Sequence, residues 1–240
     1  MTGTPRLPDL SVVVPYFNRE ATVQATLESV EFAKRGLNVD TILVDDGSTP
    51  SAEEQLRGHR FQPDRIVRQE NRGLLFARLA GLSAAAGEFV LFLDSDDLVG
   101  PDKFVAQVSA MRAGKADVSY TDCAQVELAQ RHDPAGLHSL EVTEDTAESA
   151  VLFVRVQPAP HCPVFRTSWL RGLVEAPLFP PSPLYNSVAE IWFYHVAAPV
   201  PATVVKVPGT HTLVGSHAGE RLTNHWERLG VASLAVMEAF

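Results

Sequence analysis

An apolar run that ends in three carboxylates constrains this chain more than any other feature of its sequence. The run Phe89–Leu93 is short, follows Gly87 and leads directly into Asp94, Asp96 and Asp97. Such a run is typical of a fully buried strand. Carboxylates that follow a buried strand lie at the carboxyl edge of a parallel sheet, where open α/β folds bind their ligands.

The close spacing of these acids allows two interpretations. Like charges repel one another at this spacing unless a cation neutralises them, and carboxylate oxygens are ligands that suit Mg²⁺ or Mn²⁺. Alternatively, the acids form a solvated turn after the strand, with Asp97 or Asp102 capping the next helix.

Strand and helix patterns alternate through the first part of the chain. We predict strands at residues 10–15, 40–44, 66–68 and 89–93, and helices at residues 20–33, from residue 48 or 51, and at 74–86. This β-α-β-α-β-α-β order predicts an α/β fold, with a parallel sheet, right-handed crossovers and helices on both faces.

A second strand end is also acidic, with Asp45 and Asp46 followed by Gly47. Either this is a turn whose Ser48 or Ser51 caps a helix, or it joins the other acids along one rim of the sheet. A nucleotide diphosphate would suit such a rim, through its base and ribose donors and a metal-bridged pyrophosphate. The sequence lacks the common glycine-rich phosphate loops, so metal and a cation such as Arg78 would have to hold the phosphates.

The second half is predicted in less detail. We expect helices at residues 101–114, 167–173 and from 189, and strands at 117–121 and 204–207. Residues 130–148 read as a polar loop over the site, 147–156 as a short helix or strand, and 177–183 as irregular. After the strand at residues 204–207 we expect a loop that contains glycines and carries His211, Ser216, His217 and Arg221. Residues 223–240 form an amphipathic helix that packs on the domain or forms a homodimer, since membrane binding favours Lys and Arg.

Composition narrows the classes of function. The net charge of −9 argues against a general nucleic-acid binder. Cys123 and Cys162 give neither a disulfide framework nor zinc spacing, which favours a cytoplasmic protein. Residues 1–10 do not resemble a signal peptide, and no apolar run approaches the roughly 20 residues of a membrane span.

Three stretches together resemble the family 2 glycosyltransferases of the GT-A fold. They are SVVVPYFNRE, TILVDDGSTP and QENRGLLFARLAGLSAAAGEFVLFLDSDDLVGP, which occur in the family's order over residues 10–102. The resemblance implies a Rossmann-like, mostly parallel central sheet flanked by helices. It also implies one GT-A domain over residues 1–240, with a nucleotide-sugar-binding half at 10–102, an acceptor-binding catalytic half at 103–222 and a C-terminal helix at 223–240.

The activity that this resemblance implies is transfer of a sugar, with inversion, from a nucleotide-diphosphate donor such as a UDP-sugar. The acceptor would be a hydroxyl of a glycan, a lipid-linked glycan or a small molecule, in polysaccharide or glycoside synthesis. The cofactor would be Mn²⁺ or Mg²⁺. We expect no nucleic-acid partner and no transmembrane segment.

Site roles carry over from the resemblance residue by residue. Asp46, with Asp45, would bind the base or its ribose, and Arg78 would face the donor. Asp96 would ligate the metal, and Asp94 would contact the ribose or, through water, the metal. The remaining residues implied for the nucleotide are Pro15, Phe17, Asn18 and Ser95, and His217 is a further metal candidate.

The general base implied by the resemblance is Glu190. Relatives often carry Glu-Asp at this point, whereas Ile191 follows Glu190 here. A base is needed because a hydroxyl is a poor nucleophile until its proton is taken. Glu190 could instead be a helix N-terminal acid that the helix dipole favours. Ile191 therefore leaves open a catalytically weak nucleotide-sugar-binding module. A nucleotidyltransferase is a more distant third class, because its glycine- and lysine-rich N-terminal loop is absent.

Overall fold

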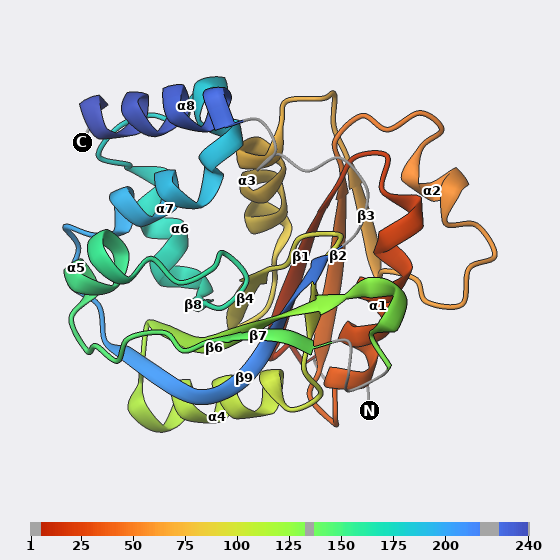
Figure 1. The fold of residues 1–240 in the computed structure, drawn as a ribbon, viewed down its shortest axis with the longest axis horizontal. Coiled ribbons are helices and arrows are strands. Elements are labelled where there is room, and N and C mark those ends of the chain that lie inside the picture. Colours follow the sequence, from red (N-terminus) through yellow and green to blue (C-terminus); the bar gives the residue numbers. More distant parts are fainter. Residues whose placement is uncertain (1–5, 133–136, 217–225, 240) are drawn as a thin grey trace.

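A computed structural model of the chain describes residues 6–132, 137–216 and 226–239. Within these residues, one nine-stranded sheet runs in the order β3-β2-β1-β4-β8-β6-β9-β5, with β7 paired to β6 (Figure 1). The strands are β1 (Leu10–Tyr16), β2 (Val39–Asp45), β3 (Arg65–Arg68), β4 (Phe89–Phe92), β5 (Leu98–Val99), β6 (Val118–Glu127), β7 (Leu137–Glu141), β8 (Val164–Arg166) and β9 (Val204–Ser216).

The helices alternate with these strands as the sequence predicts for the first half. They are α1 (Glu20–Ala33), α2 (Ala52–Gln55), α3 (Leu74–Ala84), α4 (Lys103–Gly114), α5 (Ser149–Val151), α6 (Thr167–Glu175), α7 (Ala189–Ala197) and α8 (Trp226–Ala239). Shorter turns are η1 (Leu128–Gln130), η3 (Leu152–Val156) and η4 (Pro183–Val188), of which η3 is π-helical.

The predicted α/β fold with a parallel first half is confirmed. β1 pairs in parallel with both β2 and β4, and β2 pairs in parallel with β3. The second half is mixed, because β6 is parallel to β9 while β8 is antiparallel to both β4 and β6. Strands from both predicted halves thus share one sheet, and the domain boundaries at residues 102 and 222 stay predictions.

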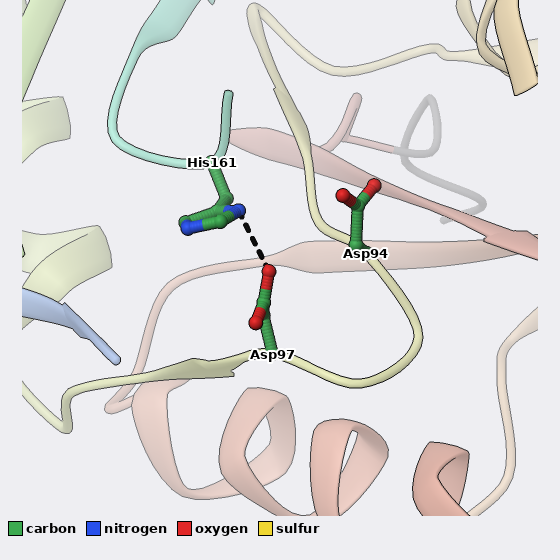
Figure 2. Close-up of side chains that lie close together, drawn as sticks. All are labelled: Asp94, Asp97 and His161. Carbon is green, nitrogen blue, oxygen red and sulfur yellow. Dashed lines mark ion pairs between the residues drawn. The ribbon is translucent and has the colours of Figure 1, made fainter. Parts of the chain in front are cut away.

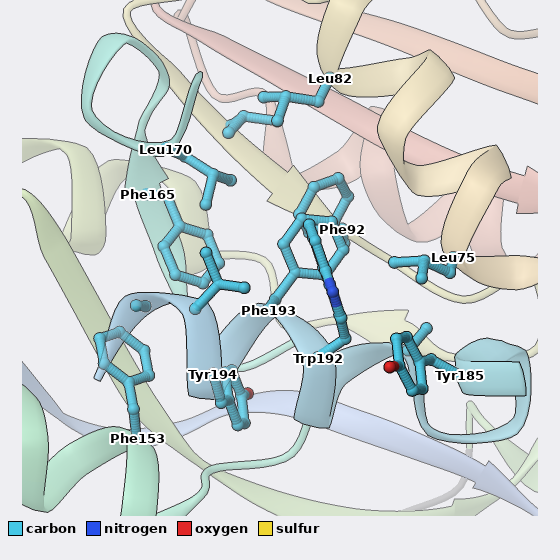
Figure 3. Close-up of a cluster of buried hydrophobic side chains, with 14 of the residues drawn as sticks. Leu75, Leu82, Phe92, Phe153, Phe165, Leu170, Tyr185, Trp192, Phe193 and Tyr194 are labelled. Carbon is cyan, nitrogen blue, oxygen red and sulfur yellow. The ribbon is translucent and has the colours of Figure 1, made fainter. Parts of the chain in front are cut away.

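Helices cover both faces of the sheet because side chains alternate along each strand. On β1, Val12 and Val14 join a core with α1 and α4, whereas Val13 joins a core with α3 and α7. Figure 3 shows the second of these cores, where aromatic rings gather around α7. The rings of Phe92 and Phe193 lie 5.1 Å apart, so α7 packs directly on the end of β4.

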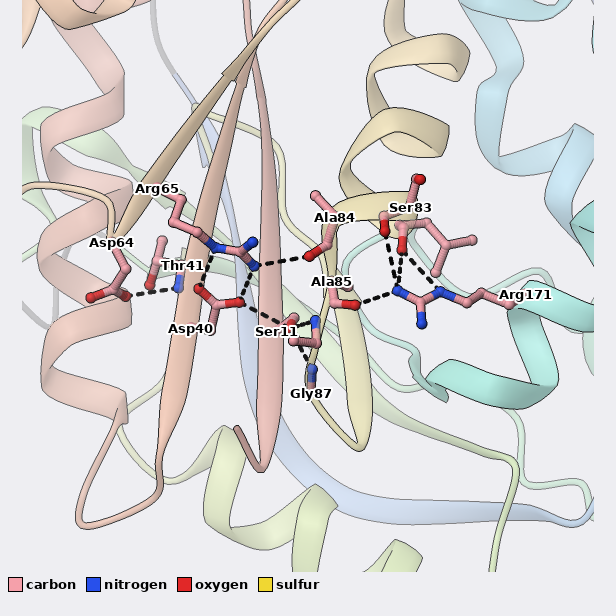
Figure 4. A network of polar contacts seen from close by, with 12 residues as sticks. Ser11, Asp40, Thr41, Asp64, Arg65, Ser83, Ala84, Ala85, Gly87 and Arg171 are labelled. Atoms are coloured by element: carbon pink, nitrogen blue, oxygen red, sulfur yellow. Dashed lines mark hydrogen bonds and ion pairs between the residues drawn. The ribbon is translucent and has the colours of Figure 1, made fainter. Parts of the chain in front are cut away.

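Helix α3 is anchored at its carboxyl end by arginines from two other elements (Figure 4). The last carbonyls of a helix have no partner within it. Arg65 of β3 donates to the carbonyl of Ala84 at 2.9 Å, and Arg171 of α6 donates to that of Leu82 at 2.9 Å. Arg65 is itself held by Asp40 of β2. These contacts fix α3 against the sheet on one side and α6 on the other.

Two predictions for the second half are wrong. Residues 211–216 are not a loop, because β9 continues past a bulge at Asp122 and pairs with β6 as far as Ser216. Residues 130–148 are not wholly loop either, since β7 pairs antiparallel with the outer part of β6. In both places backbone hydrogen bonding to β6 outweighs a polar, glycine-containing local sequence.

The C-terminal helix α8 packs one face on the domain. Its Ala232 and Val236 are buried, while Val231, Leu234 and Met237 are exposed. The packing is as predicted, and a homodimer through the exposed side chains stays a prediction. Among the helices in the described residues, none is both long enough and apolar enough to cross a membrane.

Candidate functional site

Three parallel strands end side by side and form the rim of the candidate site. Tyr16 at the end of β1 pairs with Asp45 of β2, and its carbonyl accepts the backbone N–H of Asp46 at 2.9 Å. The backbone N–H of Leu93, just past β4, bonds to the carbonyl of Val13 on β1 at 2.9 Å. The acidic residues after β2 and β4 are therefore at one edge of the sheet, as the sequence predicts.

Asp45 builds the turn after β2. It is fully buried and accepts the backbone N–H groups of Ser48 at 2.8 Å and Ala52 at 3.0 Å. Ser51 caps α2 in a capping box with Glu54, so the alternative of a capped helix start is confirmed here. Both oxygens of Asp45 are engaged within the protein.

Asp46 organises a turn from a distant part of the chain. Its Oδ1 accepts the Gln69 side chain at 2.7 Å and the Arg72 backbone N–H at 2.9 Å, and its Oδ2 accepts the Gly73 N–H at 2.8 Å. Charge-assisted bonds of this kind are among the stronger hydrogen bonds in proteins. Asp46 therefore sets the start of α3 relative to the rim.

The predicted nucleoside loop, residues 15–18, lies beside this turn. Pro15 is buried within β1, whereas Phe17 and Asn18 are exposed. Asn18 has a left-handed backbone (φ 51°), its N–H bonds to Ser48 Oγ at 3.0 Å, and its side chain accepts the Thr49 N–H at 3.1 Å. The loop is thus tied to the turn after β2, and the exposed ring of Phe17 is available to a ligand.

Arg78 of α3 joins two acids from separate elements. Its Nη2 lies 2.8 Å from Oδ1 of Asp94, and its Nη1 lies 3.5 Å from Oε2 of Glu190 on α7. Only 2% of the Arg78 side chain is exposed, against 27% for Asp94 and 30% for Glu190. Burial by itself lowers the pKa of Arg78, but the two carboxylates outweigh it and raise the pKa above its ordinary value. The structure therefore brings together three residues singled out from the sequence.

The end of β4 holds a second charged group. Asp97 accepts the Gly215 N–H at 2.8 Å and pairs with Nδ1 of His161 at 2.9 Å, so it does not cap α4 (Figure 2). Burial lowers the pKa of His161, but Asp97 more than offsets this and raises the pKa to about 9. Asp102 stands at the start of α4 without a side-chain cap bond and pairs with Arg35 instead. The alternative of capping by Asp97 or Asp102 is therefore wrong.

One group of side chains has ligand atoms close enough to share a cation. Atoms of Asp94, Asp97 and His161 lie within 4.8 Å of one another. Asp96 is partly exposed on the same loop and Ser95 is buried. His217 and Arg221 lie outside the described residues. Carboxylate oxygens on this loop fit a hard divalent cation, whereas His161 is already paired with Asp97.

A cavity of about 400 Å³ opens at the start of α3. It is lined by Asn71, Arg72, Gly73, Phe76, Pro183 and Asn186. Asn186, on η4, accepts the Leu75 N–H at 3.1 Å and donates to the Arg72 carbonyl at 2.8 Å. The cavity therefore lies between the start of α3 and the segment that leads into α7.

Sequence reasoning missed several of these contributors. The sequence gives His161 no role of its own, because its pairing with Asp97 joins two segments that are far apart in the chain. Asn186 is 114 positions from Arg72, so no local pattern places them together. Asp97 was singled out, but in a different role.

Residues 11–173 match the sequence profile of glycosyl transferase family 2. Among curated relatives, the succinoglycan biosynthesis protein ExoO of Rhizobium meliloti (strain 1021) is 33% identical over 126 residues, covering 51% of this chain and 35% of ExoO. The validoxylamine A glucosyltransferase of Streptomyces hygroscopicus subsp. jinggangensis is 34% identical over 165 residues, covering 66% of this chain and 37% of that enzyme. The chain therefore spans little more than a third of the length of these relatives.

Among solved structures, S. aureus TarS 1–349 in complex with UDP-GlcNAc is similar to this chain with a TM-score of 0.68. The match covers 94% of this chain and 66% of that chain, at 20% sequence identity. At this identity the likeness establishes the fold, and it agrees with the sheet and helix arrangement described above.

Proposed function

Since this chain belongs to glycosyl transferase family 2, we propose that it moves a sugar from a nucleotide-diphosphate donor to a hydroxyl group of an acceptor. The observation that carries the proposal is the buried Arg78, which holds Asp94 of the rim and Glu190 of α7 on either side of its guanidinium. Placing a buried cation between two partly exposed acids costs folding stability. A role of these three side chains in the reaction would explain this cost.

The donor is proposed to be a UDP-sugar lying along the rim. TarS binds UDP-GlcNAc and UDP, and its fold is that of this chain. The base and ribose would meet Asp46, the exposed ring of Phe17 and the remaining residues proposed from the sequence, namely Pro15, Asn18, Asp45 and Ser95. Asp46 already positions the backbone there, and further donors from a ligand can share its oxygens.

A divalent cation, Mn²⁺ or Mg²⁺, is proposed to bind the loop after β4 through Asp96, with Asp94 assisting. The hard oxygen donors on this loop fit such an ion. When bound, the ion would stabilise the negative charge of the leaving diphosphate. Arg78 fixes the orientation of Asp94 by the 2.8 Å bond. His217 is retained as a further metal candidate from the sequence.

Glu190 is proposed as the general base of an inverting transfer. Its ion pair with Arg78 uses Oε2. Among the described residues, no hydrogen-bond donor reaches its Oε1, so that oxygen is available to an acceptor hydroxyl. Glu190 would take the proton of the acceptor hydroxyl as its oxygen attacks the sugar carbon. The diphosphate would depart from the opposite face of that carbon.

The acceptor is proposed to be a glycan, a lipid-linked glycan or a small molecule. The relatives' names support this range, since ExoO is a succinoglycan biosynthesis protein and another relative glucosylates validoxylamine A. A nucleotide-sugar-binding module with weak turnover is the second candidate. It is favoured by Ile191, which follows Glu190 where relatives often carry a second acid.

Titration of UDP into the protein, with and without Mn²⁺, tests the proposed function. We expect UDP binding that strengthens at least tenfold with Mn²⁺. In Asp96→Ala the Mn²⁺-dependent gain should vanish, while Asp102→Ala, an exposed acid at the start of α4, should keep it. No UDP binding by the native protein in either condition would refute the proposal.

Turnover of nucleotide sugars by Glu190→Gln separates the two candidates. Glutamine has nearly the same shape but cannot take a proton, so UDP affinity should persist while turnover falls by roughly 100-fold or more. Equal turnover in the native protein and the variant would remove Glu190 from the mechanism. Absence of turnover in both, with UDP bound by both, would favour the binding module.

A further inference from the structure

We propose that the cavity at the start of α3 is an acceptor subsite that binds an oxyanion of the acceptor, a phosphate or a carboxylate, through Arg72. The inference rests on the proposed function, because it identifies a chemical class for the acceptor. It depends on three features of the cavity: a wall held by hydrogen bonds on both sides, an arginine side chain without an acidic partner among the described residues, and a position where η4 meets the start of α3.

The wall of the cavity is built to a tight fit. Gly73 has a left-handed backbone (φ +90°), and a Cβ at this position would lie 2.1 Å from Nδ2 of Asn186. The Asn186 side chain can therefore lie flat against the turn, where it bonds to Leu75 N–H and the Arg72 carbonyl. From the other side Asp46 holds the Arg72 and Gly73 N–H groups. The backbone of Arg72 is thus fixed at both its N–H and its carbonyl.

The guanidinium of Arg72 is positioned but not neutralised. Its Cζ lies 4.4 Å from the centre of the Phe76 ring. Among the described residues, no carboxylate lies within ion-pair distance of it, whereas Arg65 and Arg112 each have acidic partners. Stacking uses one face of a guanidinium and leaves the in-plane N–H donors free, and that edge matches the two oxygens of a carboxylate or phosphate.

The place of the cavity favours an acceptor as its occupant. Asn186 on η4 precedes Glu190 on α7 by four positions, and Gly73, which caps the start of α3, precedes Arg78 by five. The cavity lies between η4 and the start of α3, and α7, which carries Glu190, follows η4 directly. An acceptor anchored by an oxyanion at Arg72 would extend along η4 toward Glu190. A protein with a net charge of −9 also needs a local cation to attract an anionic substrate.

Glucose 6-phosphate and glucuronate serve as oxyanion probes, with glucose as their neutral match, in calorimetric titrations without nucleotide. We expect the native protein to bind at least one of the anionic sugars at least tenfold more tightly than glucose, and Arg72→Gln to lose that preference. Arg60→Gln is the matched control, because Arg60 also stacks on a phenylalanine, 5.1 Å from the Phe61 ring, outside the cavity. Equal binding of both anionic sugars by Arg72→Gln and the native protein would refute the proposal.

Titration of UDP and of uridine with Mn²⁺ distinguishes acceptor from donor. We expect Arg72→Gln to bind both ligands within about twofold of the native protein. If UDP binding falls as far as probe binding while uridine binding is unchanged, Arg72 contacts the donor diphosphate and the acceptor assignment is wrong. If the native protein binds the probes but not UDP, the proposed function fails while the oxyanion site stands.

Discussion

Arg78 and Asp94 are joined by a 2.8 Å bond that links the middle of α3 to the loop after β4. The arginine is almost fully buried, and its Nε has no hydrogen-bond partner among the described residues. Burying a charge without satisfying all of its donors costs stability. The bond and the neighbouring Glu190 offset part of that cost, and both acids are held beside the guanidinium.

Arg78→Met should therefore affect ligand binding more than folding. The variant removes a buried charge with an orphaned donor, and the two acids left behind are exposed enough to be hydrated, so we expect a stability loss of no more than about 1–3 kcal/mol. Without the guanidinium, Asp94 and Glu190 lose their fixed orientation, and UDP–Mn²⁺ affinity should fall at least tenfold.

Chemical denaturation and UDP titration measure the two effects separately. Arg65→Met is the control, since Arg65 also pairs with an acid but lies away from the rim beside Asp40. It should lose stability and keep its UDP affinity. Native UDP affinity in Arg78→Met would contradict a role for this arginine in the site.

The contact between Gly73 and Asn186 predicts a non-additive pair of substitutions. Gly73→Ala introduces both a clash with the amide and a side chain at φ +90°, which together should cost about 1–3 kcal/mol. Asn186→Ala removes the amide that caps Leu75. In the double variant the clash is gone, so its loss should be smaller than the sum of the single losses by about 1 kcal/mol. Denaturant unfolding of the four proteins gives the coupling, and additive losses would contradict the tight fit.

Lys103 is another buried cation, and among the described residues no carboxylate is a hydrogen-bond partner of its ammonium group. Its Nζ donates to Thr212 Oγ1 at 2.9 Å and to the Cys162 carbonyl at 3.1 Å. After Lys103→Met, Gln107 still donates to that carbonyl at 3.1 Å. We therefore expect Lys103→Met to be at least as stable as the native protein at neutral pH, as replacement of buried charge by an apolar side chain often is.

The pH dependence of this difference follows from the ionisation of Lys103. Burial lowers the pKa of Lys103 from 10.5 to about 8. Between those values the unfolded chain binds a proton that the folded chain has released, so this residue raises the free energy of unfolding as pH increases. The advantage of the methionine variant should shrink by about 3 kcal/mol across that range. Parallel denaturation of both proteins from neutral to alkaline pH measures it, and a constant difference would contradict the assignment.

Local sequence patterns were sufficient for much of the fold. The β-branched run at residues 10–15 and the apolar run at 89–93 predict buried strands because their composition and length suit little else. Parallel pairing then places Asp46 and Asp94 at one edge. The resemblance to the family assigned separate site roles to Arg78, Asp94 and Glu190, but the contacts between them come from the structure alone.

What local patterns could not predict depends on contacts between distant segments. Residues 211–216 look like a loop by themselves and become a strand because β6 offers them partners along its length. His161 has no sequence signal of a role until the fold sets it 2.9 Å from Asp97. The cavity near Gly73 depends on an asparagine more than a hundred positions away.

Helix α3 is held at its beginning by Asn186 and at its end by Arg65 and Arg171. Hydrogen bonds at both of its ends oppose a slide or rotation of this helix. Selectivity in such a scaffold must therefore change by replacing side chains around α3, and exchanges on the turn before it and on η4 would alter which molecules are accepted while leaving the Arg78 guanidinium in place.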